Sequence, residues 1–68
     1  MNDPMSVHSV DQLETLIDAH GLRNVLESLA IICYGKAEHL RANWQDDVAA
    51  RVWESDARKI DKCAARVA

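Results

Sequence analysis

The side chains best suited to bind a metal or to act as nucleophiles are scattered along the chain. They are three histidines and two cysteines: His8, His20, Cys33, His39 and Cys63. Metal sites usually draw on closely spaced pairs such as CxxC, HxxxH or HExxH, because neighbouring ligands then share one loop or one helix face. The sequence contains none of these spacings. We therefore expect no metal site and no cofactor.

The nearest approach to an acid–base cluster is formed by Tyr34, Glu38 and His39. On a helix Tyr34 and Glu38 lie one turn apart on a shared face, whereas the adjacent Glu38 and His39 point in different directions. Catalysis needs groups that converge on one reacting atom. The sequence also has no Gly-rich phosphate loop and no nucleophile–base motif. We predict that the protein is not an enzyme and that these residues form a solvated helix face.

Basic residues gather near the C-terminus and form what we call the basic ridge. Its members are Arg51, Arg58, Lys59, Lys62 and Arg66. Helical spacing places most of them along one side of a helix, where they could neutralise phosphates or bind an acidic protein. Two features argue against nucleic-acid binding. Residues 1–50 contain five more acidic than basic residues, and Glu54 can pair with Arg58 of the ridge. Nucleic-acid binding through the ridge is therefore kept as the alternative.

A chain of 68 residues has room for one small domain. Folding at this length buries only about 60% of the surface that the unfolded chain exposes, so small proteins usually add disulfides, a metal or a partner chain. With two cysteines and no metal motif, a partner chain is the remaining option. The N-terminus shows no secretory signal, and the longest apolar run, residues 29–34, is far shorter than a membrane span of about 20 residues. We expect a reduced, cytoplasmic protein with no membrane partner.

The hydrophobic pattern predicts an all-α fold in a single domain over residues 9–68, after a flexible segment over residues 1–8. The expected helices cover about residues 10–20, 23–43 and 47–66.

Capping residues set the expected ends of these helices. Ser9 and Gln12 have the spacing of a capping box at the start of the first helix, and Gly21 is suited to end it. Asn43 or Asp46 can serve as the N-cap of the third helix.

The middle of the second helix is apolar on all sides over residues 29–34, so it must be covered on more than one side. Gly35 follows and indicates a close backbone contact or a kink, because glycine inside a helix costs about 1 kcal/mol relative to alanine. Glu38 and Arg41 have the spacing of an ion pair along this helix.

An apolar stripe with a seven-residue repeat runs along the third helix. It consists of Ala49, Trp53, Ala57, Ile60, Ala64 and Val67. If the second and third helices fold back on each other, facing residue numbers sum to roughly 90, and large residues meet small ones, as Trp53 meets Ala37. This pattern predicts an antiparallel αα-hairpin.

The same register keeps the two cysteines apart. Cys63 is expected opposite Leu26, about 10 Å along the axis from Cys33, whereas a disulfide needs Cα atoms within about 7 Å. We predict two free thiols that pack as small buried apolar groups.

Apolar side chains remain that the hairpin cannot cover, namely Ile31, Ile32 and Val52. The first helix is short for that task, and contiguous exposed apolar surface usually marks an interface. We therefore predict a homodimeric helical bundle that uses these three residues as the oligomer interface.

The stretch from Gly21 to Glu54, with KAEHLRANWQD as its most distinctive piece, resembles short uncharacterised all-helical proteins of bacteria. The resemblance implies a helical fold and carries over no active site. Taken together, the sequence favours a non-enzymatic protein that binds itself and an unknown protein partner. The alternative is a small nucleic-acid-associated regulator that uses the basic ridge.

Overall fold

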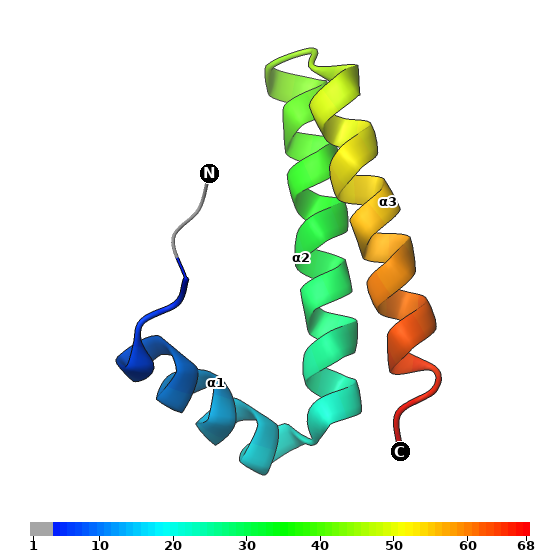
Figure 1. The fold of residues 1–68 in the computed structure, drawn as a ribbon. Coiled ribbons are helices and arrows are strands. Elements are labelled where there is room, and N and C mark those ends of the chain that lie inside the picture. Colours follow the sequence, from blue (N-terminus) through cyan, green and yellow to red (C-terminus); the bar gives the residue numbers. More distant parts are fainter. Residues whose placement is uncertain (1–3) are drawn as a thin grey trace.

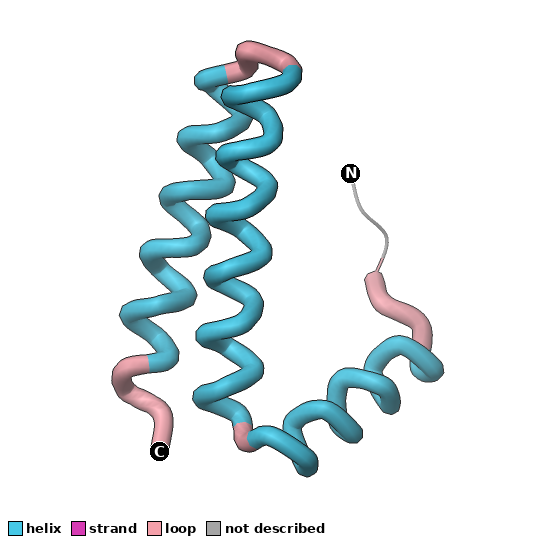
Figure 2. The backbone as a smooth tube through the Cα atoms, turned by 180° about the vertical axis from the view of Figure 1, so that it is seen from behind, coloured by secondary structure: helices cyan, strands magenta, loops and turns pink. Residues whose placement is uncertain are grey.

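A computed structural model describes residues 4–68 and contains three helices and no strand over that range (Figure 1). The helices are α1 (Val7–His20), α2 (Leu22–Asn43) and α3 (Asp47–Ala64). α2 and α3 lie side by side and run in opposite directions, while α1 leaves the start of α2 on the side away from α3 (Figures 1 and 2). The predicted all-α fold and α2–α3 hairpin are confirmed. The dimeric assembly remains a prediction.

Small residues form the contact between α2 and α3. The buried side chains of the described chain are Ala30, Cys33 and Ala37 on α2 and Ala50, Ala57 and Ala64 on α3. The three alanines of α3 are seven residues apart, which is close to two turns, so they lie on one line that faces α2. Because an alanine carries only a methyl group, the two backbones pack closely but bury little apolar area. We call this contact the alanine seam.

Two contacts across the hairpin fix its register. The ammonium group of Lys36 lies 5.5 Å from the centre of the Trp53 ring. The guanidinium group of Arg23 donates a hydrogen bond of 3.4 Å to the carbonyl of Ala65. Both pairs agree with the predicted register, in which facing residue numbers sum to roughly 90.

The predicted stripe of α3 is wrong at one end, because Ala50 is fully buried and Ala49 only half-buried. From Ala57 back to Ala50 is a step of seven residues, which turns a helix by only about 20° from the starting face. A step of eight turns it by about 80°, which carries Ala49 off the line of the seam.

α1 begins three residues earlier than predicted. The hydroxyl of Ser6 accepts a hydrogen bond of 3.1 Å from the backbone N–H of Ser9, so Ser6 is the N-cap and the predicted box of Ser9 and Gln12 is not formed. Val7 therefore lies in the helix rather than in the predicted flexible segment, of which residues 1–3 lie outside the described residues.

The other predicted caps are largely confirmed. Gly21 ends α1 with φ of +85°, and its N–H donates a hydrogen bond of 2.7 Å to the carbonyl of Ile17. Such a positive φ strains residues with a side chain, which is why glycine is suited to this position. Asp46 is the N-cap of α3 and accepts from the N–H of Ala49 at 3.0 Å, whereas Asn43 is the last residue of α2.

α3 ends at Ala64 and not at residue 66. The chain tightens there, since the N–H of Arg66 donates to the carbonyl of Cys63 at 3.0 Å, a three-residue step that replaces the helical step of four. Cys33 is buried and free as predicted, and Cys63 is also free. Cys63 is exposed rather than buried, because it stands next to Ala64 of the seam and thus points about 100° away from it.

The interpretation of Gly35 is also wrong. A Cβ atom added there would meet nothing within 4 Å, so no second backbone approaches it. α2 continues through this residue without a break (Figure 1). Over residues 4–68, no helix combines the length and the apolar character needed to cross a membrane.

Candidate functional site

The angle between α1 and α2 contains an open groove of about 540 Å³, which we call the α1–α2 groove. It is lined mainly by apolar side chains, among them Leu13 and Leu16 from α1 and Val25, Leu29, Ile31 and Ile32 from α2. His20, Asn24, Glu27 and Ser28 complete the lining. The groove exists because Gly21 breaks the helix and sends α1 away from the hairpin (Figure 2).

The large apolar side chains of the groove are mostly open to water. Ile31 is 70% exposed, Ile32 54% and Leu16 47%. α1 has no buried residue and contacts only α2, so it does not shield these side chains. Full burial of an isoleucine contributes about 1.5–3 kcal/mol. The single chain does not gain this full contribution at Ile31 or at Ile32. The arrangement is suited to receive an apolar partner.

The structure does not bring Val52 together with Ile31 and Ile32. Val52 lies on α3 and is 58% exposed, but it is not among the residues that line the groove. The predicted interface thus falls into two separate regions, the groove and the outer face of α3.

The basic ridge lies on the outer face of α3, opposite the alanine seam. All five members are exposed, and Arg66 stands in the turn that follows the helix. Within residues 4–68, none of them forms an ion pair. Lys59, Lys62 and Arg66 border a shallow hollow of about 400 Å³ whose other lining residues are Cys63 and Val67.

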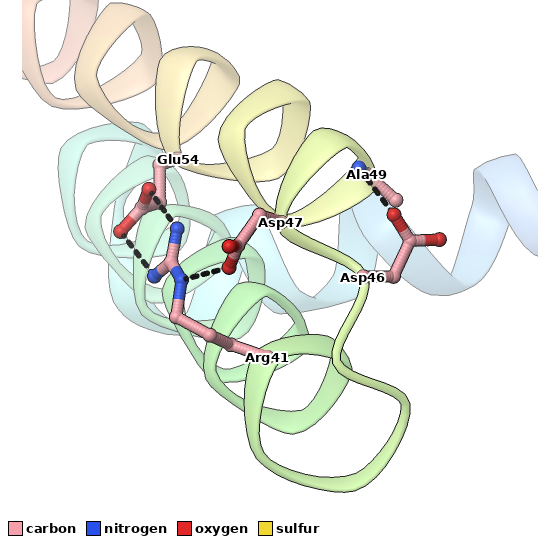
Figure 3. A network of polar contacts seen from close by, with 5 residues as sticks. All are labelled: Arg41, Asp46, Asp47, Ala49 and Glu54. Atoms are coloured by element: carbon pink, nitrogen blue, oxygen red, sulfur yellow. Dashed lines mark hydrogen bonds and ion pairs between the residues drawn. The ribbon is translucent and has the colours of Figure 1, made fainter.

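Sequence reasoning missed the main polar contact of the molecule, an ion-pair clasp at the loop end of the hairpin (Figure 3). Arg41 donates two hydrogen bonds to the carboxylate of Glu54, at 3.0 and 2.9 Å, and a third to Asp47 at 3.2 Å. The predicted pairs of Arg41 with Glu38 and of Glu54 with Arg58 are therefore wrong. A bidentate contact with Glu54 and a further bond to Asp47 are together stronger than a single pair along one helix, so Arg41 reaches across to α3. In the sequence, only the hairpin register indicated this clasp, because it places Arg41 and Glu54 at the same end of the hairpin.

The clasp shifts the pKa of Arg41 and of Glu54. The hydrogen bonds from Arg41 hold the pKa of the Glu54 carboxyl below its ordinary value. The hydrogen bonds to Glu54, and then the one to Asp47, raise the pKa of Arg41. The clasp lies at the surface and joins α2 to α3, so we assign it a structural role.

Tyr34, Glu38 and His39, which were predicted to form a solvated helix face, are all exposed on α2. His39 forms a hydrogen bond of 2.9 Å between its Nδ1 atom and the side-chain amide of Asn43, one turn further along α2. Among residues 4–68, no three His, Cys, Asp or Glu side chains come together as a metal site would require.

Comparison of the chain with protein-family models, with curated proteins and with solved structures gives no match.

Proposed function

We propose that this chain is a non-enzymatic interaction protein that self-associates through the α1–α2 groove, most simply as a two-fold dimer, and binds a further protein in that form. The observation that carries the proposal is the contrast between a seam of five alanines and one cysteine and an exposed groove that contains Ile31 and Ile32.

The buried side chains of the described residues are all small. No side chain larger than cysteine is buried among residues 4–68, although twelve large apolar side chains are exposed. A domain with this distribution gains little from burial inside one chain and much from burial between chains. Two-fold pairing places the same surface of each copy against the other, so one groove is sufficient to build the interface.

Sedimentation equilibrium of the wild type and two variants tests the proposal. We expect the wild type to be dimeric at micromolar concentration and Ile32→Lys to be monomeric, because the variant places a charge in the apolar contact. Val48→Lys is the matched control, since Val48 is 75% exposed and stands on α3 at the far end of the hairpin from the groove. A wild type that is monomeric, and whose melting temperature is unchanged over a hundredfold dilution, would contradict self-association.

The unpaired basic ridge supports a second candidate, a small nucleic-acid-associated regulator. Binding to a fluorescent DNA duplex at several salt concentrations separates the two. Contacts with phosphates make the logarithm of the affinity fall linearly with the logarithm of the salt concentration. We expect weak binding or none, because the chain carries a net charge of −3. Tight binding that Lys62→Gln weakens would favour the second candidate.

The free thiols of Cys33 and Cys63 fit a reducing compartment. As part of the proposal we place the protein in the cytoplasm, without a cofactor.

A further inference from the structure

The outer face of α3 carries two kinds of exposed side chain, one at each end. Near the start of the helix Val48 and Val52 are 75% and 58% exposed. Lys59, Lys62 and Arg66 of the basic ridge stand at the other end and border the hollow of about 400 Å³. The face is therefore apolar toward the loop of the hairpin and basic toward the C-terminus.

These side chains follow one line along α3, opposite the alanine seam. Val48 stands nine residues before Ala57 of the seam, and a helix turns by about 180° over nine residues. Val52, Lys59 and Lys62 follow it by four, eleven and fourteen residues, which keeps each of them within about 40° of that line. From Val48 to Lys62 the face extends for about 21 Å, long enough for a partner helix to lie along it.

The proposed dimer leaves this face uncovered. The residues that line the α1–α2 groove belong to α1 and α2. α1 and α3 lie on opposite sides of α2 in both views, so a second copy that packs on the groove stays away from the outer face of α3 (Figures 1 and 2). Each copy of a two-fold dimer therefore keeps this face open to a further molecule.

The charges at the basic end select an acidic partner, and the apolar end favours a protein over a nucleic acid. Within residues 4–68 none of the three basic side chains forms an ion pair, so all three can pair with anionic groups of another molecule. Trp44, in the loop just before α3, adds a side chain that is 70% exposed at the apolar end. Valine side chains gain nothing from a phosphate, whereas apolar side chains, and tryptophan above all, are common in protein interfaces.

We infer that the outer face of α3 binds the further protein, and that it receives an acidic amphipathic helix of that partner. Carboxylates of the partner helix pair with Lys59, Lys62 and Arg66. Its apolar side chains pack on Val48 and Val52. The partner helix runs antiparallel to α3, because its carboxylates then lie in its first turns, where the helix dipole stabilises them. The inference rests on the binding of a further protein in the proposed function, but not on self-association.

The test measures the binding of a designed, fluorescently labelled peptide to the full chain by fluorescence anisotropy. The glutamate probe is an alanine-based helix of about 18 residues, long enough to be helical in water. It carries three glutamates in its first half, at the spacing of the three basic side chains, and two leucines in its second half. The glutamine probe has glutamine in place of each glutamate. We expect the glutamate probe to bind about tenfold or more tightly than the glutamine probe, and to bind more weakly as the salt concentration rises.

Substitutions in the chain test both ends of the face. Neutralising the basic end should weaken binding of the glutamate probe about tenfold or more. This variant carries Lys59→Gln, Lys62→Gln and Arg66→Gln. The control makes the same change in net charge at exposed positions of α1 and should bind the glutamate probe within about twofold of the wild type at physiological salt, because charges beyond a Debye length are screened. It carries Gln12→Glu, Thr15→Glu and Ala19→Glu. Val52→Ser should weaken both probes, and circular dichroism checks that each variant remains helical.

Cys63 shows where the probe binds. Its thiol is exposed and free and lines the hollow at the basic end, whereas Cys33 is buried in the alanine seam. A saturating amount of the glutamate probe should slow the reaction of Cys63 with N-ethylmaleimide severalfold, because the bound helix covers the hollow. Cys33 should react slowly with or without the probe.

Failure of the inference and failure of self-association give different results. If the glutamate probe binds no more tightly than the glutamine probe, or leaves Cys63 as reactive as before, the inference is wrong, whereas a dimeric wild type still supports self-association. If a DNA duplex binds more tightly than the glutamate probe at the same salt concentration, the basic end serves the nucleic-acid candidate and the inference is again wrong. A monomeric wild type that binds the glutamate probe as expected contradicts self-association and supports the inference.

Discussion

The α2–α3 hairpin and α1 are both helical, but different interactions hold them in place. The hairpin has a buried alanine seam, a cation–π contact and the ion-pair clasp of Arg41. α1 has no buried residue and contacts only α2. An isolated helix of 14 residues is marginal in water, because nucleation is costly and most helical stability in proteins comes from tertiary packing. Helix formation and helix docking therefore depend on different interactions. In this chain buried side chains dock α2 on α3, and none of them belongs to α1.

Hydrogen exchange should reveal the largest difference between the two regions. We expect the amides of α1 in dilute protein to exchange about tenfold faster or more than those at the centre of α2 and α3, because few tertiary contacts oppose local opening of α1. Protection of α1 should rise with protein concentration if a second copy receives it. Equal protection of all three helices in a monomeric sample would contradict the expected difference between α1 and the hairpin.

Overpacking the alanine seam should destabilise the hairpin. Ala37 is 1% exposed, so Ala37→Leu must force α2 and α3 apart and should lower the free energy of unfolding by about 1–3 kcal/mol in urea titrations. Ala42→Leu, at an exposed position near the end of the same helix, is the control and should have little effect. If both variants unfold at the same urea concentration, the seam is not tightly packed.

Glycine substitutions should change stability in opposite directions. Gly35→Ala should raise the free energy of unfolding by about 1 kcal/mol, since the new methyl group meets nothing within 4 Å and alanine favours the helix. Gly21→Ala should lower it, because φ of +85° strains a residue with a side chain. Thermal unfolding of both variants measures the effect, and a destabilised Gly35→Ala would mean that a neighbour approaches there after all.

The smallest expected effect is the pH dependence of the clasp. The pKa of Glu54 is lower in the folded chain than its ordinary value of 4.5, so the unfolded chain binds more protons in this range. The stabilisation is present above about pH 4.5 and is lost as the pH falls through the lower, folded pKa. Melting temperatures from pH 6 to pH 3 should therefore fall less for Glu54→Gln than for the wild type. Glu38→Gln, which removes an exposed carboxyl outside the clasp, should follow the wild type.

The sequence alone determined the features that depend on neighbours along one helix. The spacing of apolar residues gave the three helices, and the glycine at position 21 and the aspartate at position 46 identified two of their boundaries. Large and small residues that alternate across the hairpin gave its register, which the contact of Lys36 with Trp53 confirms. These features are local or repeat along a helix, so several residues of the sequence indicate each of them.

Only the tertiary structure decided how side chains are shared between helices. A shift of one residue turns a side chain by about 100°, which is enough to bury Ala50 in place of Ala49 and to expose Cys63. Arg41 has several carboxylates within its sequence neighbourhood, and the close approach of α3 selects Glu54 and Asp47 from among them. The direction of α1 depends on the backbone angles of Gly21, and no spacing of apolar residues specifies those angles. The α1–α2 groove follows from that one direction, because it places α1 and α3 on opposite sides of α2.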